Sequence, residues 1–334
     1  MKAYEIKKFG YDGLAIVDRP DPEPGANQVL IQMHAWSLNY RDLMTLMGRY
    51  NPRLKLPQIP LSDGAGEVVA VGAGVKSVRV GDRVANTFFE RWVSGLATDE
   101  TARTALGAGR DGVLAENVVL HEDGVARIPE HMTYAEAATL PCAALTAWHA
   151  LVVEGKIKAG DTILTLGTGG VSIFALQFAL MHGAQVIITS SSDEKLDKAK
   201  KLGATHTINY KQTPDWSRSV RQLTGGRGVD HVVELGGPGT FNQSVASLRR
   251  GGQMSLIGVL AQGGEANIVP ILMNGIRVQG IFVGSREMFD AMNTAIALHR
   301  LHPIIHQTFG FDQAPEAFRL MESCKHLGKI CIRR

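Results

Sequence analysis

A glycine cluster between two apolar runs is the feature of this sequence with the clearest chemical meaning. The runs 162–166 and 186–189 are strand-like, and apolar residues recur with helical spacing between them. Three glycines follow the first run: Gly167, Gly169 and Gly170. In a dinucleotide-binding strand–turn–helix unit, such glycines permit a tight turn and let a pyrophosphate approach the backbone and the helix amides. This order of elements predicts a nicotinamide dinucleotide site, with a tight turn that binds no ligand as the alternative.

The residues around this turn bear on which dinucleotide would bind. Ser172 stands where a third glycine would let helix and strand pack closely, so we expect a slightly strained contact there. The second run ends in hydroxyl residues instead of the acid that binds the ribose of NAD: Ser190, Ser191 and Ser192. Hydroxyl groups and the nearby Lys195 suit a 2′-phosphate, which favours NADP(H). NAD remains an alternative because Asp193 could bind a ribose, or it could only help to cap the next helix.

Composition and charge exclude several classes of protein. The chain has 334 residues, is 45% hydrophobic and carries a formal net charge of +3, which suggests about two domains with a real core. The near balance of charge argues against a nucleic-acid partner or a polybasic membrane surface. Three cysteines form no disulfide framework and no CxxC pair, and there is no secretory signal or apolar run of about 20 residues. We therefore expect a cytoplasmic protein without a membrane anchor.

The pattern of elements changes once along the chain. Residues 1 to about 130 show short β-rich runs with Gly and Pro turns, which indicates an antiparallel barrel, and the stretch 86–115 is interpreted as a long, partly mobile surface segment. A helix is expected from Thr133, because Glu136 completes a capping box.

Strands and helices alternate beyond residue 159, which predicts a parallel sheet covered on both faces. The expected strands are 162–166, 186–189, 206–209, 231–235, 253–259 and 278–283. The expected helices are 171–182, 194–202, 216–224 and 240–247.

Several segments together resemble one known family over the whole chain. They are SLNYRDL (37–43), AGEVVAVGAGV (65–75), VGDRV (80–84), LPCAALTAW (140–148), LGTGGVSIFALQFA (166–179) and LGATHTINY (202–210). The sequence resembles the medium-chain dehydrogenase/reductase superfamily, in particular its zinc-lacking, quinone oxidoreductase-like branch. The resemblance implies an α/β fold with a GroES-like β-barrel catalytic domain (1–143 and 284–334) and a Rossmann doubly wound parallel sheet that binds NADP (144–283). It also implies a substrate cleft between the domains.

The resemblance also bears on metal content. Zinc-using relatives carry Cys, His and Cys at the positions of Asn39, Ser62 and Cys142, and four clustered cysteines in the loop that corresponds to 86–115. Catalytic zinc needs three ligands from Cys, His or a carboxylate. We therefore expect no zinc at either place.

The resemblance implies a set of coenzyme-binding residues. Ser191, Lys195 and Tyr210 match the Ser, Lys and Tyr that contact the 2′-phosphate in quinone oxidoreductases, although Tyr210 could only pack over a loop. Thr146 matches a threonine that packs against the nicotinamide. The rest of the set lies at the glycine turn and at strand ends: Gly167, Thr168, Gly169, Gly170, Val171, Ser190, Ser192, Leu235, Gly236, Gly258, Val259, Phe282 and Val283.

Chemistry without a metal limits the reaction. Hydride addition to a carbon–carbon double bond conjugated to a carbonyl, or to a quinone, needs only hydrogen-bond donors for the developing oxyanion. Asn39 and Tyr40 stand where the metal site would be, so they are the candidate donors. We interpret Asp42 as part of an ion pair with Arg41 that orders the loop. Tyr50 either lines the cleft or merely covers it.

These observations predict a zinc-independent NADP(H)-dependent oxidoreductase that reduces a quinone or an α,β-unsaturated carbonyl compound. The alternatives are an NADP(H)-dependent alcohol or aldehyde dehydrogenase and a non-catalytic NADPH-binding module. The family often pairs edge strands across a two-fold axis, so a homodimer is expected, with QGIFVG (279–284) as the apolar candidate strand.

Overall fold

The computed structural model describes residues 1–258, 260 and 263–334, and the chain forms two compact units. One unit comprises Met1–Leu145 and Val283–Arg334, and the other comprises Thr146–Phe282. In the described part of the chain, no helix combines the length and the apolar character that crossing a bilayer requires.

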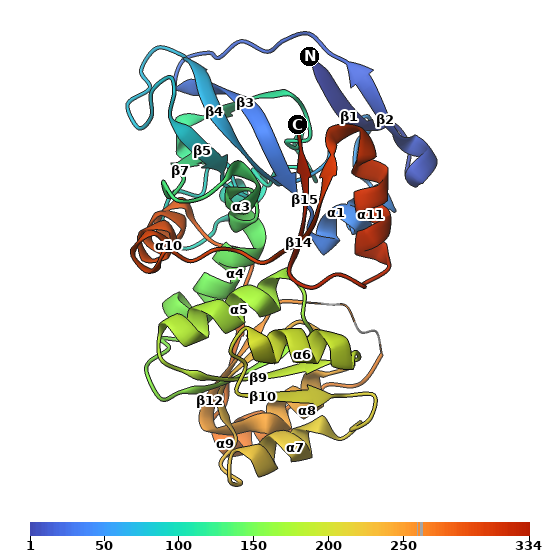
Figure 1. Ribbon diagram of the computed structural model, residues 1–334, viewed down its shortest axis with the longest axis vertical. Helices are drawn as coiled ribbons and strands as arrows, with labels where there is room; N and C mark the ends of the chain where they lie inside the picture. Colours follow the sequence, from blue (N-terminus) through green and yellow to red (C-terminus); the bar gives the residue numbers. More distant parts are fainter. Residues whose placement is uncertain (259, 261–262) are drawn as a thin grey trace. The chain divides into compact units, whose positions relative to one another are not determined.

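The first unit is built on a mostly antiparallel sheet (Figure 1). Its strands in spatial order are β14 (Ile305–Gly310), β15 (Lys329–Arg333), β3 (Gln28–Ser37), β4 (Asp63–Val71), β5 (Arg83–Asn86) and β7 (Val125–Arg127), with β6 (Asn117–His121) paired to β3 and a separate hairpin of β1 (Lys2–Ile6) and β2 (Leu14–Asp18). The side chains of β3 alternate between buried and half-buried because one face of the strand packs on the core. Strand β15 brings the C-terminal end of the chain beside β3 in antiparallel register.

Short helices complete the first unit and hold the residues that follow the strands. They are α1 (Tyr40–Leu46), α2 (Asp99–Ala102), α3 (Tyr134–Ala137), α10 (Arg286–His299) and α11 (Ala314–Glu322). The capping box predicted for α3 is confirmed, because the Glu136 amide donates to Thr133 Oγ1 at 3.2 Å and the Thr133 amide donates to Glu136 Oε2 at 2.8 Å. Wide helical turns at Leu140–Ala144 and His149–Glu154 flank α4 (Leu145–Trp148).

The interpretation of 86–115 as a partly mobile surface segment is wrong for its two ends, whereas most residues of 93–111 are exposed. Phe88, Phe89 and Trp92 are buried, and their rings contact one another at centroid distances of 4.8 and 5.5 Å. Leu106 and Leu114 are also buried. These apolar side chains anchor the segment, whereas the sequence interpretation gave more weight to its many small and polar residues.

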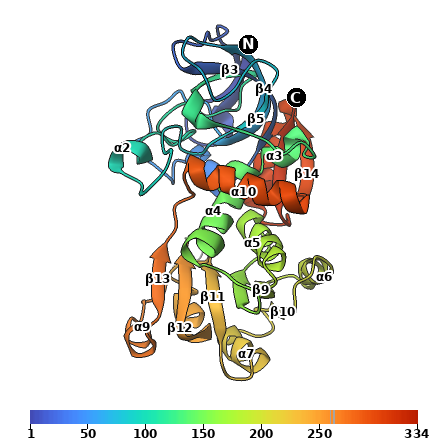
Figure 2. The same cartoon turned by 90° about the vertical axis from the view of Figure 1, so that its left-hand side faces the viewer.

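The second unit is the predicted parallel sheet with helices on both faces. Its strands in spatial order are β10 (His206–Asn209), β9 (Gln185–Ser190), β8 (Thr162–Leu166), β11 (Val229–Glu234), β12 (Leu248–Leu256) and β13 (Arg277–Gly280), as the view along the sheet in Figure 2 shows. The helices α5 (Gly170–Met181) and α6 (Asp193–Lys201) cover one face, and α7 (Trp216–Leu223), α8 (Phe241–Ser247) and α9 (Val269–Asn274) cover the other. The order confirms a doubly wound sheet in which the direction of winding reverses at β8.

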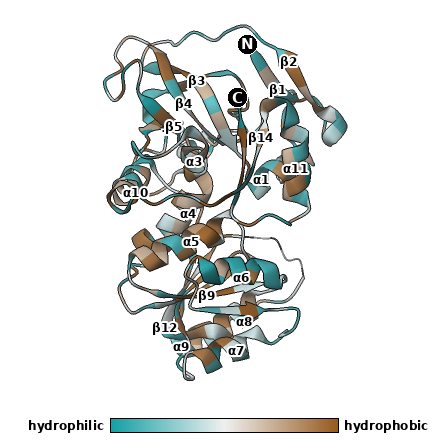
Figure 3. Cartoon of the chain, viewed as in Figure 1, coloured by the Kyte–Doolittle hydropathy of each residue, from teal (hydrophilic) through white to brown (hydrophobic). Residues whose placement is uncertain are grey.

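The hydropathy of α5 and α6 explains how deeply each helix is buried. Figure 3 shows α5 as largely hydrophobic and α6 as largely hydrophilic. Helix α5 is buried over most of its length, whereas in α6 only Leu196 and Ala199 are buried. The helix that follows the glycine turn is therefore fixed firmly to the sheet.

Four of the six predicted strands have different bounds in the structure, and β12 and β13 differ by three residues or more at one end or both. Strand β13 ends at Gly280 instead of residue 283, and Val283 has a left-handed backbone with a φ of 56°, so Phe282 and Val283 lie beyond the strand. Strand β12 begins at Leu248 instead of residue 253 and ends at Leu256, and Val259 lies outside the described residues.

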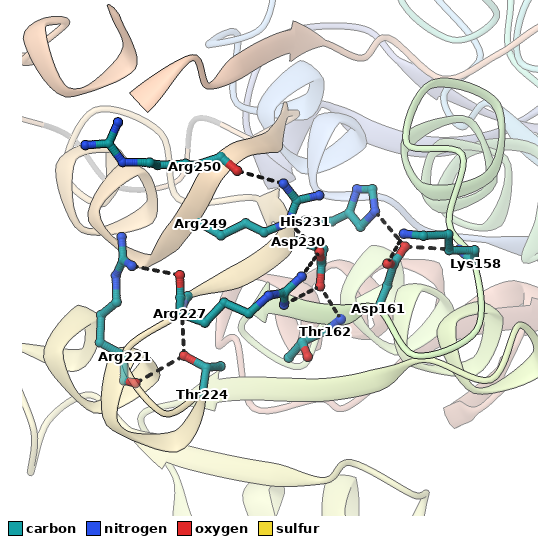
Figure 4. Close-up of polar contacts among 11 residues, drawn as sticks. Lys158, Asp161, Thr162, Arg221, Thr224, Arg227, Asp230, His231, Arg249 and Arg250 are labelled. Carbon is teal, nitrogen blue, oxygen red and sulfur yellow. Dashed lines mark hydrogen bonds and ion pairs between the residues drawn. The ribbon is translucent and has the colours of Figure 1, made fainter. Parts of the chain in front are cut away.

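A network of ion pairs ties together the amino ends of β8, β11 and β12 (Figure 4). The buried Asp230 carboxylate accepts two hydrogen bonds from Arg227 at 2.6 and 2.9 Å, one from Arg249 Nε at 2.5 Å and one from the Thr162 amide at 2.9 Å. Burial tends to raise the pKa of Asp230, but the two guanidiniums hold it well below its ordinary value. This network leaves the opposite, carboxyl edge of the sheet as the place for a ligand.

We expect Asp230→Asn to destabilise the protein by about 2–4 kcal/mol at pH 7, because the change leaves two arginines without their shared anion. A depressed carboxyl pKa stabilises the fold above the ordinary Asp value, so the effect is fully present at neutral pH. Urea unfolding measures it. The matched control is Glu194→Gln in the exposed Lys198–Glu194 pair, which should change stability by less than about 0.5 kcal/mol. Equal stabilities of Asp230→Asn and the wild type would contradict the prediction.

Candidate active site

The glycine turn after β8 has the geometry that a pyrophosphate needs. Gly167 adopts a left-handed φ of 76°, which favours glycine, and its amide lies 3.4 Å from the Thr189 hydroxyl that accepts its hydrogen bond. A Cβ placed on Gly167 or Gly169 would meet no heavy atom within 4 Å, so the space above the turn is open to a ligand. Gly169 is the N-cap of the 12-residue helix α5 and provides no side-chain cap. The first amides of α5 are therefore available to an anion, and the turn fits a dinucleotide.

Ser172 fits this turn through a hydrogen bond, and the strained contact expected there is not what the structure shows. The side chain is fully buried, and its Oγ donates to the Leu166 carbonyl oxygen at 2.7 Å. The hydroxyl thus links the first turn of α5 to the last residue of β8. At this position glycine would let the helix and strand backbones touch directly, whereas the serine side chain links them through its hydroxyl, which is hydrogen-bonded.

The end of β9 brings together the residues expected at a 2′-phosphate. The Tyr210 amide donates to the Ser190 carbonyl at 3.1 Å, so the end of β10 lies beside the end of β9. Ser192 caps α6, because its Oγ accepts from the Lys195 amide at 3.4 Å. The ring of Tyr210 is 41% exposed. The backbone therefore places Ser190–Ser192, Lys195 and Tyr210 at one corner of the sheet.

Asp193, the acid that left NAD as an alternative coenzyme, has hydrogen-bond partners within the protein. The Asp193 carboxylate accepts hydrogen bonds from Asn209 Nδ2 at 2.7 Å and from Gln212 Nε2 at 2.9 Å. These contacts hold α6 to the end of β10. They leave Asp193 less able to bind a ribose diol than a carboxylate without such partners.

At the end of β11, the turn is held by the buried carboxylate of Glu234. Glu234, the last residue of β11, is fully buried and accepts hydrogen bonds from the Gly236 and Gly237 amides at 2.6 and 2.9 Å, from Thr240 and from Ser244. A Cβ on Gly258 would clash with the Leu235 carbonyl oxygen at 1.9 Å. Leu235, Gly236 and Gly258 thus belong to one close approach of backbones at the carboxyl edge.

The remaining coenzyme candidates differ in exposure. Phe282 is 50% exposed, whereas Val283 and Thr146 are buried. Phe282 and Thr146 belong to the second unit and Val283 to the first, and the coenzyme contacts expected for them stay predictions.

The first unit contains a second group of functional candidates, at the start of α1. Asn39 is the N-cap of this helix, and its amide donates to Asp42 Oδ2 at 2.8 Å. The interpretation of Asp42 as a residue that orders this loop is confirmed by that bond and by the contact with Arg41 Nη1 at 3.4 Å. Tyr40, the first helical residue, is 39% exposed.

A buried lysine holds the Asn39 side chain. Lys329, the first residue of β15, is 3% exposed, and its ammonium donates to Asn39 Oδ1 at 2.6 Å and to the Leu38 carbonyl at 2.7 Å. The oxygen of the Asn39 carboxamide is therefore fixed toward the cation. Its nitrogen, Nδ2, is buried and has no hydrogen-bond partner of good geometry among the described residues. The carboxamide thus offers a donor and not an acceptor.

The Asp63 carboxylate and the Cys142 thiol lie close enough to this ammonium to be affected by its charge. The Ser62 hydroxyl donates to Asp63 Oδ1 at 2.7 Å, and the Cys142 amide donates to Asp63 Oδ2 at 3.1 Å. Burial raises the pKa of Asp63, although Lys329 and the hydrogen bonds from neighbours, including the nearby Asn39 carboxamide, act in the opposite direction. Burial and the Asp63 carboxylate raise the pKa of the Cys142 thiol far above its ordinary value.

The donor set at Asn39, Ser62 and Cys142 does not suit zinc. The Asn39 oxygen is bound to a cation, the Ser62 hydroxyl donates to a carboxylate, and the third position is a thiol that resists ionisation. Zinc requires thiolate, imidazole or carboxylate ligands. Among the described residues, no group of three or more His, Cys, Asp or Glu could hold a metal ion.

The sequence interpretation missed Lys329, Asp63 and Glu234. Lys329 begins the apolar run KICIR, and a charged first residue gives no signal that its side chain turns inward. Its partner Asn39 lies 290 residues earlier. Glu234 offered a weak local signal, because a buried strand that ends in an acid before Gly236 and Gly237 suggests a carboxylate that caps a turn.

Comparison with known proteins agrees with this geometry. Residues 25–130 match the family model of the alcohol dehydrogenase GroES-like domain, and residues 170–297 match that of the zinc-binding dehydrogenases. A zinc-type alcohol dehydrogenase-like protein of Schizosaccharomyces pombe is 44% identical, over 97% of this chain and 96% of its own length. The two units define an NAD(P)-dependent oxidoreductase. The chain belongs to the medium-chain dehydrogenase/reductase superfamily, as its motifs predicted.

Solved structures extend the comparison. A putative alcohol dehydrogenase from Sinorhizobium meliloti has a TM-score of 0.93 at 40% identity, over 100% of this chain and 98% of its own. A mycobacterial protein solved in complex with NADPH has a TM-score of 0.83 at 28% identity, with complete coverage of both chains. The predicted α/β fold with a GroES-like unit and a Rossmann sheet is confirmed.

We expect Asp42→Asn to gain stability relative to the wild type as the pH rises. Burial raises the pKa of Asp42 to about 6, although Arg41 opposes this shift. A carboxyl group with a raised pKa favours the fold while it is protonated and costs stability above that pKa, whereas Asn cannot ionise. Between pH 4.5 and 7.5, the difference in unfolding free energy between variant and wild type should shift by about 2 kcal/mol in favour of the variant.

Urea unfolding at the two pH values measures this shift. Asp12→Asn, a substitution at an exposed position, provides the matched control and should show a difference that does not vary with pH. A pH-independent difference for Asp42→Asn as well would contradict the assigned direction.

Proposed function

We propose that this protein uses NADPH to reduce a quinone or an α,β-unsaturated carbonyl compound, without zinc. The observation that carries the proposal is the Asn39 carboxamide, whose oxygen is fixed by the Lys329 ammonium and whose Nδ2 has no hydrogen bond of good geometry among the described residues, although the Asp63 carboxylate lies near it. In zinc-using relatives this position holds a metal ligand. A donor suits an oxyanion that develops when hydride adds to a conjugated double bond.

The chain's own residues have separate tasks in this reaction. The coenzyme would lie on the turn Gly167–Val171 and supply the hydride when bound. Asn39 would donate to the carbonyl oxygen of the acceptor, and the buried Lys329 would stop its carboxamide from flipping. Tyr40 and Thr146 remain candidates for positioning the acceptor and the nicotinamide, and the proton would come from water or a hydroxyl group.

Two further predictions remain part of the proposal. NADP(H) is favoured over NAD(H) because the acid next to the serines, Asp193, is engaged by Asn209 and Gln212. The relative solved with NADPH supports the same choice. A homodimer fits the edge position of β13 and the exposed side chains of the adjacent α9: Ile268, Val269, Leu272 and Met273.

Alcohol oxidation is the second candidate, because one relative that is similar in sequence and one that is similar in structure carry alcohol dehydrogenase-like or putative alcohol dehydrogenase names. Absorbance of NADPH with a panel of quinones and enones, against NADP⁺ with a panel of alcohols, separates the two reactions. Metal analysis of the purified protein tests the zinc-free proposal. Stoichiometric zinc, with activity lost to a chelator and restored by zinc, would overturn it.

We expect Asn39→Asp to lower kcat for an enone or quinone by about 10²–10³-fold, because it replaces the donor with a carboxylate of the same size. The Kd for NADPH, measured by fluorescence titration, should stay within about twofold of the wild-type value. Asn39→Ala should show a loss of kcat of the same order. Unchanged turnover in both variants would remove Asn39 from the reaction.

We expect Lys195→Gln to weaken NADPH binding by about tenfold and to leave NADH binding nearly unchanged, because only NADPH carries the 2′-phosphate that a cation would attract. Fluorescence titration with both coenzymes measures the two dissociation constants. Lys198→Gln, on the same helix but paired with Glu194 at 2.6 Å, is the matched control and should not alter the ratio. A parallel loss of affinity for both coenzymes would contradict a 2′-phosphate role.

A further inference from the structure

Arg41 has a buried guanidinium with one edge that no described residue binds. The residue is 9% exposed, and its Nη1 donates to the Leu106 carbonyl at 2.7 Å and lies 3.4 Å from Asp42 Oδ1. Nε and Nη2 are buried and have no hydrogen-bond partner among the described residues. A guanidinium stays charged at physiological pH, so two unpaired donors in a buried place carry a substantial cost in free energy.

The unpaired atoms form the edge that suits a carboxylate. Nε–H and one Nη2–H point in parallel, and a planar anion can accept both bonds at once. The other nitrogen, Nη1, is the one that Leu106 and Asp42 occupy. The protein has therefore used the opposite end of the guanidinium to hold it, and the buried two-pronged edge has no hydrogen-bond partner among the described residues.

Two aromatic rings fix the plane of this guanidinium. The centroid of the Tyr50 ring lies 5.0 Å from Arg41 Cζ, and that of the Phe88 ring lies 4.9 Å away. Such contacts stabilise a cation and lower the local dielectric constant, which strengthens a bond to an incoming anion. Tyr50 therefore packs on the Arg41 guanidinium, and whether it lines or covers a cleft stays a prediction.

Arg41 is the second residue of α1, two positions after Asn39, which is the residue proposed to act on the carbonyl oxygen. Asn39 Nδ2, two residues earlier, is the other unpartnered donor at the start of α1. A ligand that binds the Arg41 edge needs an acidic group. A monoanion suits Arg41 better than a phosphate dianion, because the guanidinium already contacts the Asp42 carboxyl group.

We propose that Arg41 binds a carboxylate of the substrate, so that the natural acceptor is an enone or quinone with an acidic substituent. This inference deepens the proposed function and rests on it for the identity of the reacting group. Arg41 is then the residue that determines specificity, while Asn39 acts on the carbonyl oxygen.

The test compares an acid with its neutral ester on one carbon frame. The probes are 6-oxohept-4-enoate and its methyl ester, in which the carboxyl group is not conjugated to the enone. We expect the wild type to reduce the acid with a kcat/KM about tenfold or more above that of the ester. The ratio should fall to about one in Arg41→Met and to an intermediate value in Arg41→Lys, which keeps the charge but not the fork.

Arg53→Met, at an exposed position in the loop after α1, is the matched control and should keep the wild-type ratio. Because the ratio is measured within one variant, a partial loss of folded protein does not change it. Equal kcat/KM values for acid and ester in the wild type, or a preference that survives in Arg41→Met, would overturn the proposal.

A binding measurement separates this proposal from the proposed reaction. Saturated 6-oxoheptanoate and its methyl ester cannot accept hydride at a conjugated double bond, so calorimetric titration of both reports recognition alone. We expect the wild type to bind the acid more tightly than the ester, and Arg41→Met to bind both equally. This result without turnover of either enone would refute enone reduction and support the Arg41 site. Turnover of both enones with equal binding of acid and ester would do the reverse.

Discussion

The contact between the Lys329 ammonium and Asn39 Oδ1 is the constraint on which the proposed chemistry depends. A buried cation at 2.6 Å leaves the carboxamide one stable orientation, because a flip would place two N–H groups against an ammonium. Asp63 lies close enough for Lys329 to lower its pKa, which offsets the cost of burying the charge. In the proposed reaction, the Lys329 side chain is the source of positive charge beside the Asn39 carboxamide.

In the second unit, the residues that stabilise the sheet and the residues expected to bind the coenzyme lie at opposite edges of the same sheet. At the amino edge, Asp230 joins Arg227 and Arg249 in closed ion pairs. At the carboxyl edge, Gly167 and Gly169 leave open space, and Glu234 uses its acceptors on its own turn. Polar groups that are fully satisfied hold the strands, while the amides at the start of α5 remain available to an anion.

Local patterns in the sequence were sufficient for most of the fold. The glycine turn, the alternation of strands and helices and the Thr133 capping box each depend on residues close together in the chain, so spacing alone predicts them. Lys329 and Asn39 could not be paired in this way, because their contact depends on β15 returning to β3 at the far end of the chain. The anchoring of 86–115 by Phe88 and Phe89 also depends on tertiary packing.

Ser172 and Arg41 illustrate why a residue has to be judged by its contacts and not only by whether it follows a family pattern. Ser172 stands where the family pattern has a glycine, yet its hydroxyl donates to the Leu166 carbonyl at 2.7 Å, so the departure adds a hydrogen bond at the turn. Arg41 satisfies only one end of its guanidinium and leaves Nε and Nη2 unpaired. Unpaired buried donors cost free energy in the folded protein, and a ligand that binds them would remove this cost. A buried polar group without a partner, such as that of Arg41, is therefore a better guide to substrate specificity than a residue that only departs from a family pattern, such as Ser172.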